Sequence, residues 1–139
     1  MQQICTAFAD VDRPADDALV CHDCEECNAL REDLRGRAPD ELSDTWVKRS
    51  FDQLPFMSDD AKRYYLPAYL RVAAQDPQGT VAQFVLFALA SDHRWQPAGS
   101  YTLTQRQVVL DYLSFIEPQL DFTSTENLAT ARQRWTNAI

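Results

Sequence analysis

The chain has 139 residues, of which 45% are hydrophobic, so it is long enough for one domain with a substantial core. Its three glycines are few for an all-β protein, and no apolar run reaches the length of a membrane span. The net charge of −8 disfavours nucleic acids as partners, because phosphates are bound through lysine and arginine.

The N-terminal stretch has no basic region followed by an apolar core, so we expect no secretory signal peptide and a cytoplasmic location. In that compartment the four cysteines are expected to stay reduced. Residues 1–27 carry seven acidic side chains and one basic side chain, a net charge of −6. This concentration predicts an acidic surface that serves either a basic partner or solubility alone. The candidate binding residues there are Asp10, Asp12, Asp16 and Asp17.

Apolar residues at helical spacing predict a first helix over residues 16–35, ended by Gly36. Its apolar stripe consists of Val20, Cys24, Cys27, Leu30 and Leu34. A second helix is expected over residues 40–54, and a third begins after Ser58, a good N-cap that two aspartates follow. Pro67 lies inside the third helix and is expected to kink or break it, because proline cannot donate the helical hydrogen bond.

Three capping-box patterns predict further helices, at residues 80–83, 104–107 and 123–126. The first of these helices is apolar on nearly every side and is expected to be the most buried element. The other two direct eight residues inward, namely Val109, Tyr112, Leu113, Ile116, Leu128, Ala131, Trp135 and Ala138. The whole pattern predicts an all-α fold, a compact single-domain bundle of five to seven helices over residues 1–139, with its last helix near residues 124–138.

The stretch CHDCEEC, residues 21–27, is the densest in chemical groups. Cys21, Cys24 and Cys27 are candidate zinc ligands, but zinc-binding C-x-x-C pairs normally lie on a tight turn with glycine or proline, and neither occurs here. On a helix, His22 points to the opposite side. A redox role needs a thiolate, which the acidic neighbours disfavour. The favoured interpretation is that Cys24 and Cys27 pack in the core without a cofactor, and zinc is the alternative.

The string RYYLPAYL places Tyr64, Tyr65 and Tyr69 within six residues. They could line a ligand groove; the favoured alternative is that Tyr65 and Tyr69 pack inward while Tyr64 lies near the rim. His93 stands beside Asp92, but catalytic triads are assembled from distant positions, so we expect a solvated loop histidine. No nucleophile-elbow, phosphate-loop or dinucleotide motif occurs, and no catalytic site is predicted.

Four stretches carry a family resemblance: CHDCEECNALREDLRGR, LPFMSDDAKRYYLPAYLRVA, FVLFAL and YTLTQRQVVLDYLSFI, with Trp46 between the first two. They resemble an uncharacterised bacterial family, domain of unknown function 6714. The resemblance covers residues 20–117, and the tyrosine string is its most specific part. It implies a small stand-alone bacterial protein and brings no established activity or catalytic residues.

These observations support three functional hypotheses. The first is a non-catalytic acidic binding module that docks on a basic protein, such as an immunity or antitoxin-like protein covering the positive active site of a nuclease-like toxin. The alternative is a metal- or redox-responsive protein that uses Cys21, Cys24 and Cys27. A small enzyme with a tyrosine-lined pocket has the least support. Neither nucleic acid nor a membrane is an expected partner.

Overall fold

Helices make up the fold in the part of the chain that the computed structural model describes, residues 2–20, 24–91 and 101–137. The predicted all-α fold is confirmed. None of the helices in these ranges is both long and apolar enough to cross a membrane. The α-helices are α1 (Gln2–Ala7), α2 (Glu25–Leu34), α3 (Asp44–Arg49), α4 (Asp59–Gln75), α5 (Thr80–Ser91), α7 (Leu103–Ile116) and α8 (Thr125–Asn137). Short 3-10 helices are η1 (Asp16–Ala18), η2 (Pro39–Glu41), η3 (Leu54–Phe56), η4 (Glu117–Gln119) and η5 (Phe122–Ser124).

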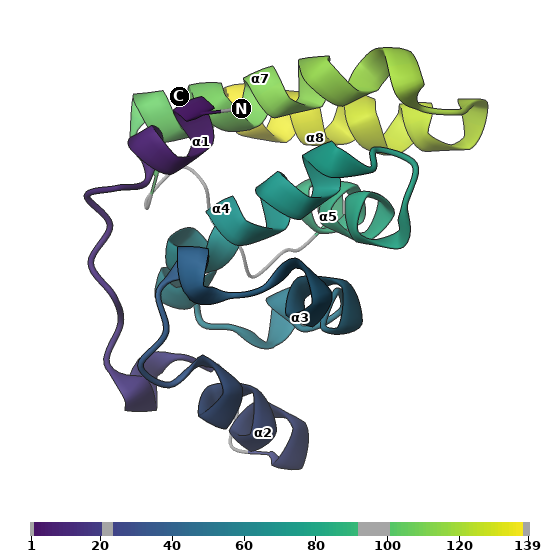
Figure 1. Ribbon diagram of the computed structural model, residues 1–139. Helices are drawn as coiled ribbons and strands as arrows, with labels where there is room; N and C mark the ends of the chain where they lie inside the picture. Colours follow the sequence, from purple (N-terminus) through teal and green to yellow (C-terminus); the bar gives the residue numbers. More distant parts are fainter. Residues whose placement is uncertain (1, 21–23, 92–100, 138–139) are drawn as a thin grey trace.

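Helix α4 lies at the centre of the fold and contacts α1, α3, α5 and α7. Figure 1 shows α7 and α8 side by side along one edge, and α5 packs against α8 while α1 packs against α7. Helix α2 lies furthest from the α7–α8 pair (Figure 1). The core between these layers contains the fully buried side chains of Leu66, Tyr69, Leu89, Leu113 and Trp135. Burial of this apolar surface contributes more to helix stability than propensity does.

Helix α4 begins where the sequence predicts. The Ser58 hydroxyl accepts the Ala61 N–H at 3.1 Å and caps the helix. Pro67 does not interrupt α4, so a break at this residue does not occur. Leu66 and Ala68 on either side of it are fully buried, and this packing offsets the cost of proline inside a helix, about 3 kcal/mol.

The helix predicted over residues 16–35 is wrong in its first half. Among the described residues of that range only η1 and α2 are helical, and Cys24 has extended dihedral angles as the N-cap of α2. The backbone between them has other partners, because the Ser58 N–H donates to the Leu19 carbonyl at 3.0 Å and Val20 forms an isolated β-bridge with Met57. Leu19 and Val20 therefore bind the residues just before α4. The five predicted apolar residues do not share one helical stripe.

The second predicted helix is divided into η2, α3 and η3. The Ser43 hydroxyl caps α3 by accepting the Trp46 N–H at 3.1 Å, so the helix begins here and not at residue 40. Pro39 and Pro55 lie in the first turns of η2 and η3, where proline is tolerated because its missing N–H has no helical acceptor.

Helix α5 is not the most buried element, contrary to the prediction. The Phe87 side chain is 53% exposed and the Phe84 side chain is half-buried, whereas Val85 and Leu89 are fully buried. One side of α5 therefore faces solvent, although nearly all its residues are apolar. Helix α4 has the central position instead, because more elements pack around it.

The predicted capping boxes lie close to the helix starts but not at them. Helix α7 begins with a box formed by Thr102 and Gln105, two residues before the predicted one. Helix α5 begins at Thr80 itself, because the Gly79 carbonyl accepts the first helical N–H. Helix α8 begins after η5, at Thr125. The inward faces of α7 and α8 are confirmed for the seven predicted residues that the structure describes, which are all buried, and Ala138 lies outside the described residues.

Candidate binding groove and cysteine pair

The tyrosine string of α4 divides into two buried residues and one residue at the surface. The Tyr65 hydroxyl donates to the Arg37 carbonyl at 2.7 Å, and the Tyr69 hydroxyl donates to the Ser50 carbonyl at 3.0 Å. Both side chains are fully buried, as the favoured interpretation predicts. Burial raises the pKa of Tyr65 to about 12 and also raises the pKa of Tyr69. These two tyrosines fasten α4 to neighbouring loops, whereas the half-buried Tyr64 lies at the rim.

A groove of about 390 Å³ lies beside Tyr64. Three segments line it, together with Phe8 and Ala38 beside them: α4, η2 and the N-terminal strap, which we define as residues 9–15. Gly36 helps to form the groove, because its positive φ of 72° turns the chain after α2 so that η2 can pack on α4. The lining is mostly apolar, with one carboxylate and one guanidinium: Phe8, Ala9, Val11, Ala38, Pro39, Asp40, Tyr64, Pro67 and Arg71.

Charged side chains join the strap to the rest of the fold. Asp16, just after the strap, forms ion pairs with Arg13 and, at 3.5 Å, with the Arg35 Nε. The hydrogen bond that Arg13 donates to Asp16 raises the pKa of Arg13, and Arg13 in turn acts to lower the pKa of Tyr65 against the larger effect of burial. The charge of Asp16 is thus partly balanced by two arginines, although its side chain stays partly exposed.

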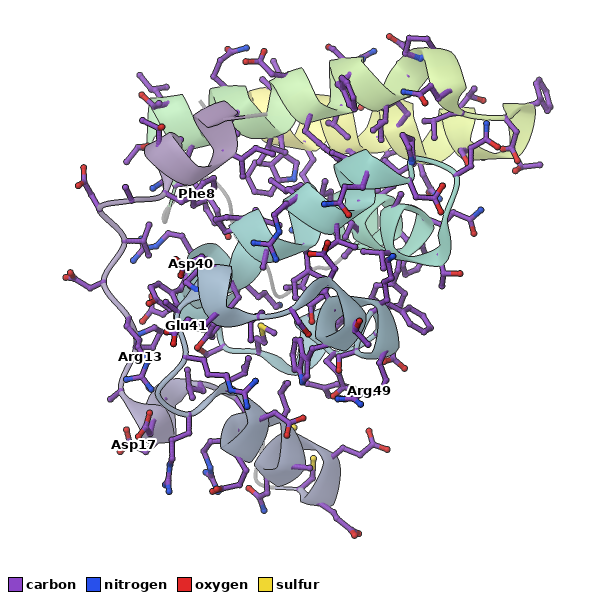
Figure 2. All side chains as sticks on the ribbon, viewed as in Figure 1. Phe8, Arg13, Asp17, Asp40, Glu41 and Arg49 are labelled. Atoms are coloured by element: carbon purple, nitrogen blue, oxygen red, sulfur yellow. The ribbon has the colours of Figure 1, made fainter. Side chains whose placement is uncertain are left out.

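An acidic face borders the groove. Asp40 lines the groove itself, and Figure 2 shows Asp17, Asp40 and Glu41 along the same edge of the molecule as Phe8. Burial is the main cause of the raised pKa of Tyr64; the charge of Arg13 acts to lower that pKa, and the charges of Asp40 and Glu41 act to raise it. We define the acidic face by five exposed carboxylates: Asp10, Asp12, Asp17, Asp40 and Glu41.

The two cysteines of the C-x-x-C pair differ in exposure. Cys24 is exposed, contrary to its predicted place in the core, whereas Cys27 is fully buried, as predicted. The prediction is wrong for Cys24 because this residue is the N-cap of α2, and its sulfur accepts the Cys27 N–H at 3.3 Å. Cys21 and His22 lie outside the described residues. Within the described ranges, no group of three or more His, Cys, Asp or Glu side chains is arranged to hold a metal ion.

A second, more open hollow of about 660 Å³ lies between α1 and α7. Asp111 is the single ionisable side chain in its described lining. No second ionisable group stands beside it there to form an acid–base pair. His93 lies outside the described residues, so its predicted place in a solvated loop stays a prediction. The groove beside Tyr64 therefore has the richer chemistry, because a carboxylate, a guanidinium and an aromatic ring line it.

One family model, described as a family of unknown function (DUF6714), matches residues 1–139. The chain belongs to this family. The DUF6714 match extends beyond residues 20–117 and includes the strap and α8. No curated protein and no solved structure matches the chain. Because DUF6714 has no described function, the function must be inferred from the groove, the acidic face and the cysteine pair.

Sequence reasoning missed the η2 wall of the groove in this DUF6714 chain. The acidic pair Asp40 and Glu41 was assigned to the start of a helix, and the place of Asp40 in the groove beside Tyr64 depends on the turn at Gly36. Arg71 gave no signal, because its partners, the Leu42 carbonyl and Asp44, are distant in sequence. Two residues could have indicated a turn before the acidic pair, namely Pro39 and the isolated Gly36.

Proposed function

We propose that the chain is a non-catalytic binding module that takes up a basic segment of a protein partner in the groove beside Tyr64. The observation that carries the proposal is a mostly apolar groove bordered by the acidic face. The positive active site of a nuclease-like toxin is one surface with the required chemistry.

The groove suits side chains that have both an apolar and a positively charged part. Val11, Pro39 and Tyr64 line it and are each partly exposed, so they offer apolar surface to a partner. The carbon chain of a lysine or arginine can lie on such a surface while its charged end reaches a carboxylate. Asp40 supplies that carboxylate within the groove, and the ring of Tyr64 supplies a face for the cation.

Two arginines beside the groove are already engaged. Arg71 donates to the Leu42 carbonyl at 2.9 Å and lies 3.5 Å from Asp44, while Arg13 is paired with Asp16. Their positive charges are thus partly balanced, and the carboxylates of the acidic face remain to attract a basic chain. Such attraction speeds encounter and is screened over about 8 Å at physiological ionic strength, whereas the apolar contact governs dissociation.

The proposal is tested with a synthetic peptide of alternating lysine and leucine, titrated into isotope-labelled protein and followed by NMR. A peptide of alternating glutamate and leucine is the reference. We expect the lysine peptide to shift amide signals of the strap, η2 and the middle of α4, and its affinity to fall as salt is added. The variant Asp10→Asn, Asp12→Asn, Asp40→Asn should weaken binding several-fold.

A matched variant, Asp52→Asn, Asp111→Asn, Glu126→Gln, removes the same charge from exposed positions on other elements. It should leave the affinity for the lysine peptide unchanged. Equal losses in the two triple variants would contradict the proposal, because net charge alone would then attract the peptide. Signal shifts confined to α7 and α8 would contradict it as well.

A further inference from the structure

We further propose that Cys24 and Cys27 form a redox pair, two thiols that are converted reversibly into a disulfide by exchange with an external disulfide. The proposal does not depend on the docking function. It rests on the place of the two residues at the start of α2 and on their opposite exposure.

The geometry brings the two residues together before any bond forms. The Cys24 sulfur lies 3.3 Å from the Cys27 backbone nitrogen. The N–Cα bond adds about 1.5 Å, so this sulfur is within about 5 Å of the Cys27 Cα atom. A disulfide also requires the two sulfur atoms to approach to about 2.05 Å, so the side chains must change rotamer, and Cys24 does so at the N-cap with extended dihedral angles, outside the regular helix.

The opposite exposure of the two thiols gives each a separate role. Cys24 is exposed, so its sulfur can attack a disulfide that arrives from solution. Cys27 is fully buried and is shielded from such a molecule. Nucleophilic cysteines of C-x-x-C pairs commonly lie at a helix N-terminus, where backbone N–H groups point at the sulfur. The Cys27 N–H is such a donor. Cys24 is therefore assigned as the attacking residue and Cys27 as the resolving residue.

The exchange has two balanced steps. In the first, the Cys24 thiolate attacks one sulfur of the external disulfide; a mixed disulfide forms, and one thiolate leaves. In the second, the Cys27 thiolate attacks the Cys24 sulfur and displaces the second thiolate. The two protons lost by the protein thiols are taken up by the two leaving thiolates. Two protein thiols are thereby oxidised and one external disulfide is reduced to two thiols.

Two features of the site work against rapid exchange. Glu25 and Glu26 are exposed in the first turn of α2, and their charges oppose a negative charge on the neighbouring sulfur. The Cys24 sulfur also has a purely structural use as a helix cap, which a serine hydroxyl would serve equally well. The experiment must therefore separate a cap from a reactive pair.

The probe is glutathione disulfide, added to the full chain under native conditions with a metal chelator present. After acid quenching, mass spectrometry should show a species that has lost two hydrogens. Cleavage before Asp23 and after Glu25 or Glu26 separates all three cysteines of the stretch, so the bond can be mapped. We expect the fragments that contain Cys24 and Cys27 to be joined. Reduced glutathione should restore both thiols.

Three variants assign the roles. Cys27→Ser should accumulate a glutathione adduct on Cys24, because the resolving thiol is gone. Cys24→Ser keeps a capping hydroxyl and should form neither the adduct nor the bond. Cys21→Ser is the matched control and should behave as the natural chain does. A bond mapped to Cys21, or a lasting adduct on Cys24 in the natural chain, would overturn the proposal. Mapping in the natural chain decides the outcome even where a variant fails to fold.

Discussion

Tyr69 and Tyr112 are both fully buried, but their hydroxyl groups have different surroundings. The Tyr69 hydroxyl donates to the Ser50 carbonyl, whereas the Tyr112 hydroxyl has no hydrogen-bond partner within the described part of the chain. A buried hydroxyl without a partner costs stability, because it gives up its hydrogen bonds to water. The apolar rings support the core in both cases, so the two hydroxyl groups can be compared directly.

The first prediction compares Tyr69→Phe with Tyr112→Phe. Tyr69→Phe should lower the free energy of unfolding by about 1 kcal/mol, because a hydrogen bond is lost while the Ser50 carbonyl still accepts the Gln53 N–H. Tyr112→Phe should leave it unchanged or raise it by up to about 1 kcal/mol. Urea unfolding of both variants gives the measurement. A clear loss of stability in Tyr112→Phe would show that its hydroxyl does have a partner.

At the scale of elements, the contact between α5 and α8 holds one side of the core. The Trp135 indole N–H donates to the Leu89 carbonyl at 3.2 Å, and Arg134 donates to the same carbonyl at 3.1 Å. Leu89 lies in the last turn of α5, where carbonyls have no helical donor, so α8 caps the end of α5 from the side. Trp135 also forms an edge contact with Tyr101, with ring centroids 5.0 Å apart.

The second prediction follows from the two sides of α5. Trp135→Ala should lower the free energy of unfolding by about 3–5 kcal/mol, because it removes a fully buried aromatic side chain. Phe87→Ala, on the exposed side of α5, should cost less than about 1 kcal/mol. Chemical denaturation measures both. Similar costs for the two substitutions would show that α8 does not cover α5 as described.

At the scale of the whole molecule, several tyrosines lose their proton at higher pH in the folded state than in the unfolded state. Burial raises the pKa of Tyr65 to about 12 and raises the pKa values of Tyr69 and Tyr112. In the unfolded chain tyrosine titrates near 10. The folded state therefore retains protons that the unfolded state releases, and this contribution to stability is complete below pH 10 and is lost as the pH rises toward 12.

The third prediction is a fall in stability above pH 10. Each tyrosine with a raised pKa should lower the free energy of unfolding by up to about 1.4 kcal/mol per pH unit in this window. Urea unfolding midpoints measured at successive alkaline pH values test the slope. In Tyr65→Phe the slope should be smaller, because one titrating group is removed. An equal slope in this variant would assign the effect to other groups.

The sequence by itself determined the helical class, the N-cap at Ser58 and the inward faces of α7 and α8. These features depend on local spacing, because a helix must bury the side on which its apolar residues recur. Ser58 acts through an N–H only three residues away, so its role is also local. The same holds for the inward direction of Tyr65 and Tyr69, four residues apart on one helix.

Tertiary structure alone decided the start of α2, the exposure of Cys24 and the groove beside Tyr64. The Leu19 carbonyl has no helical donor because it accepts the Ser58 N–H, a partner thirty-nine residues away. Asp16 pairs with Arg35, which is nineteen residues away, and the turn at Gly36 allows η2 to pack on α4. Helix ends and grooves depend on which distant group supplies the hydrogen bond or the charge. Sequence periodicity does not indicate those partners, because it reflects only the spacing of neighbouring residues.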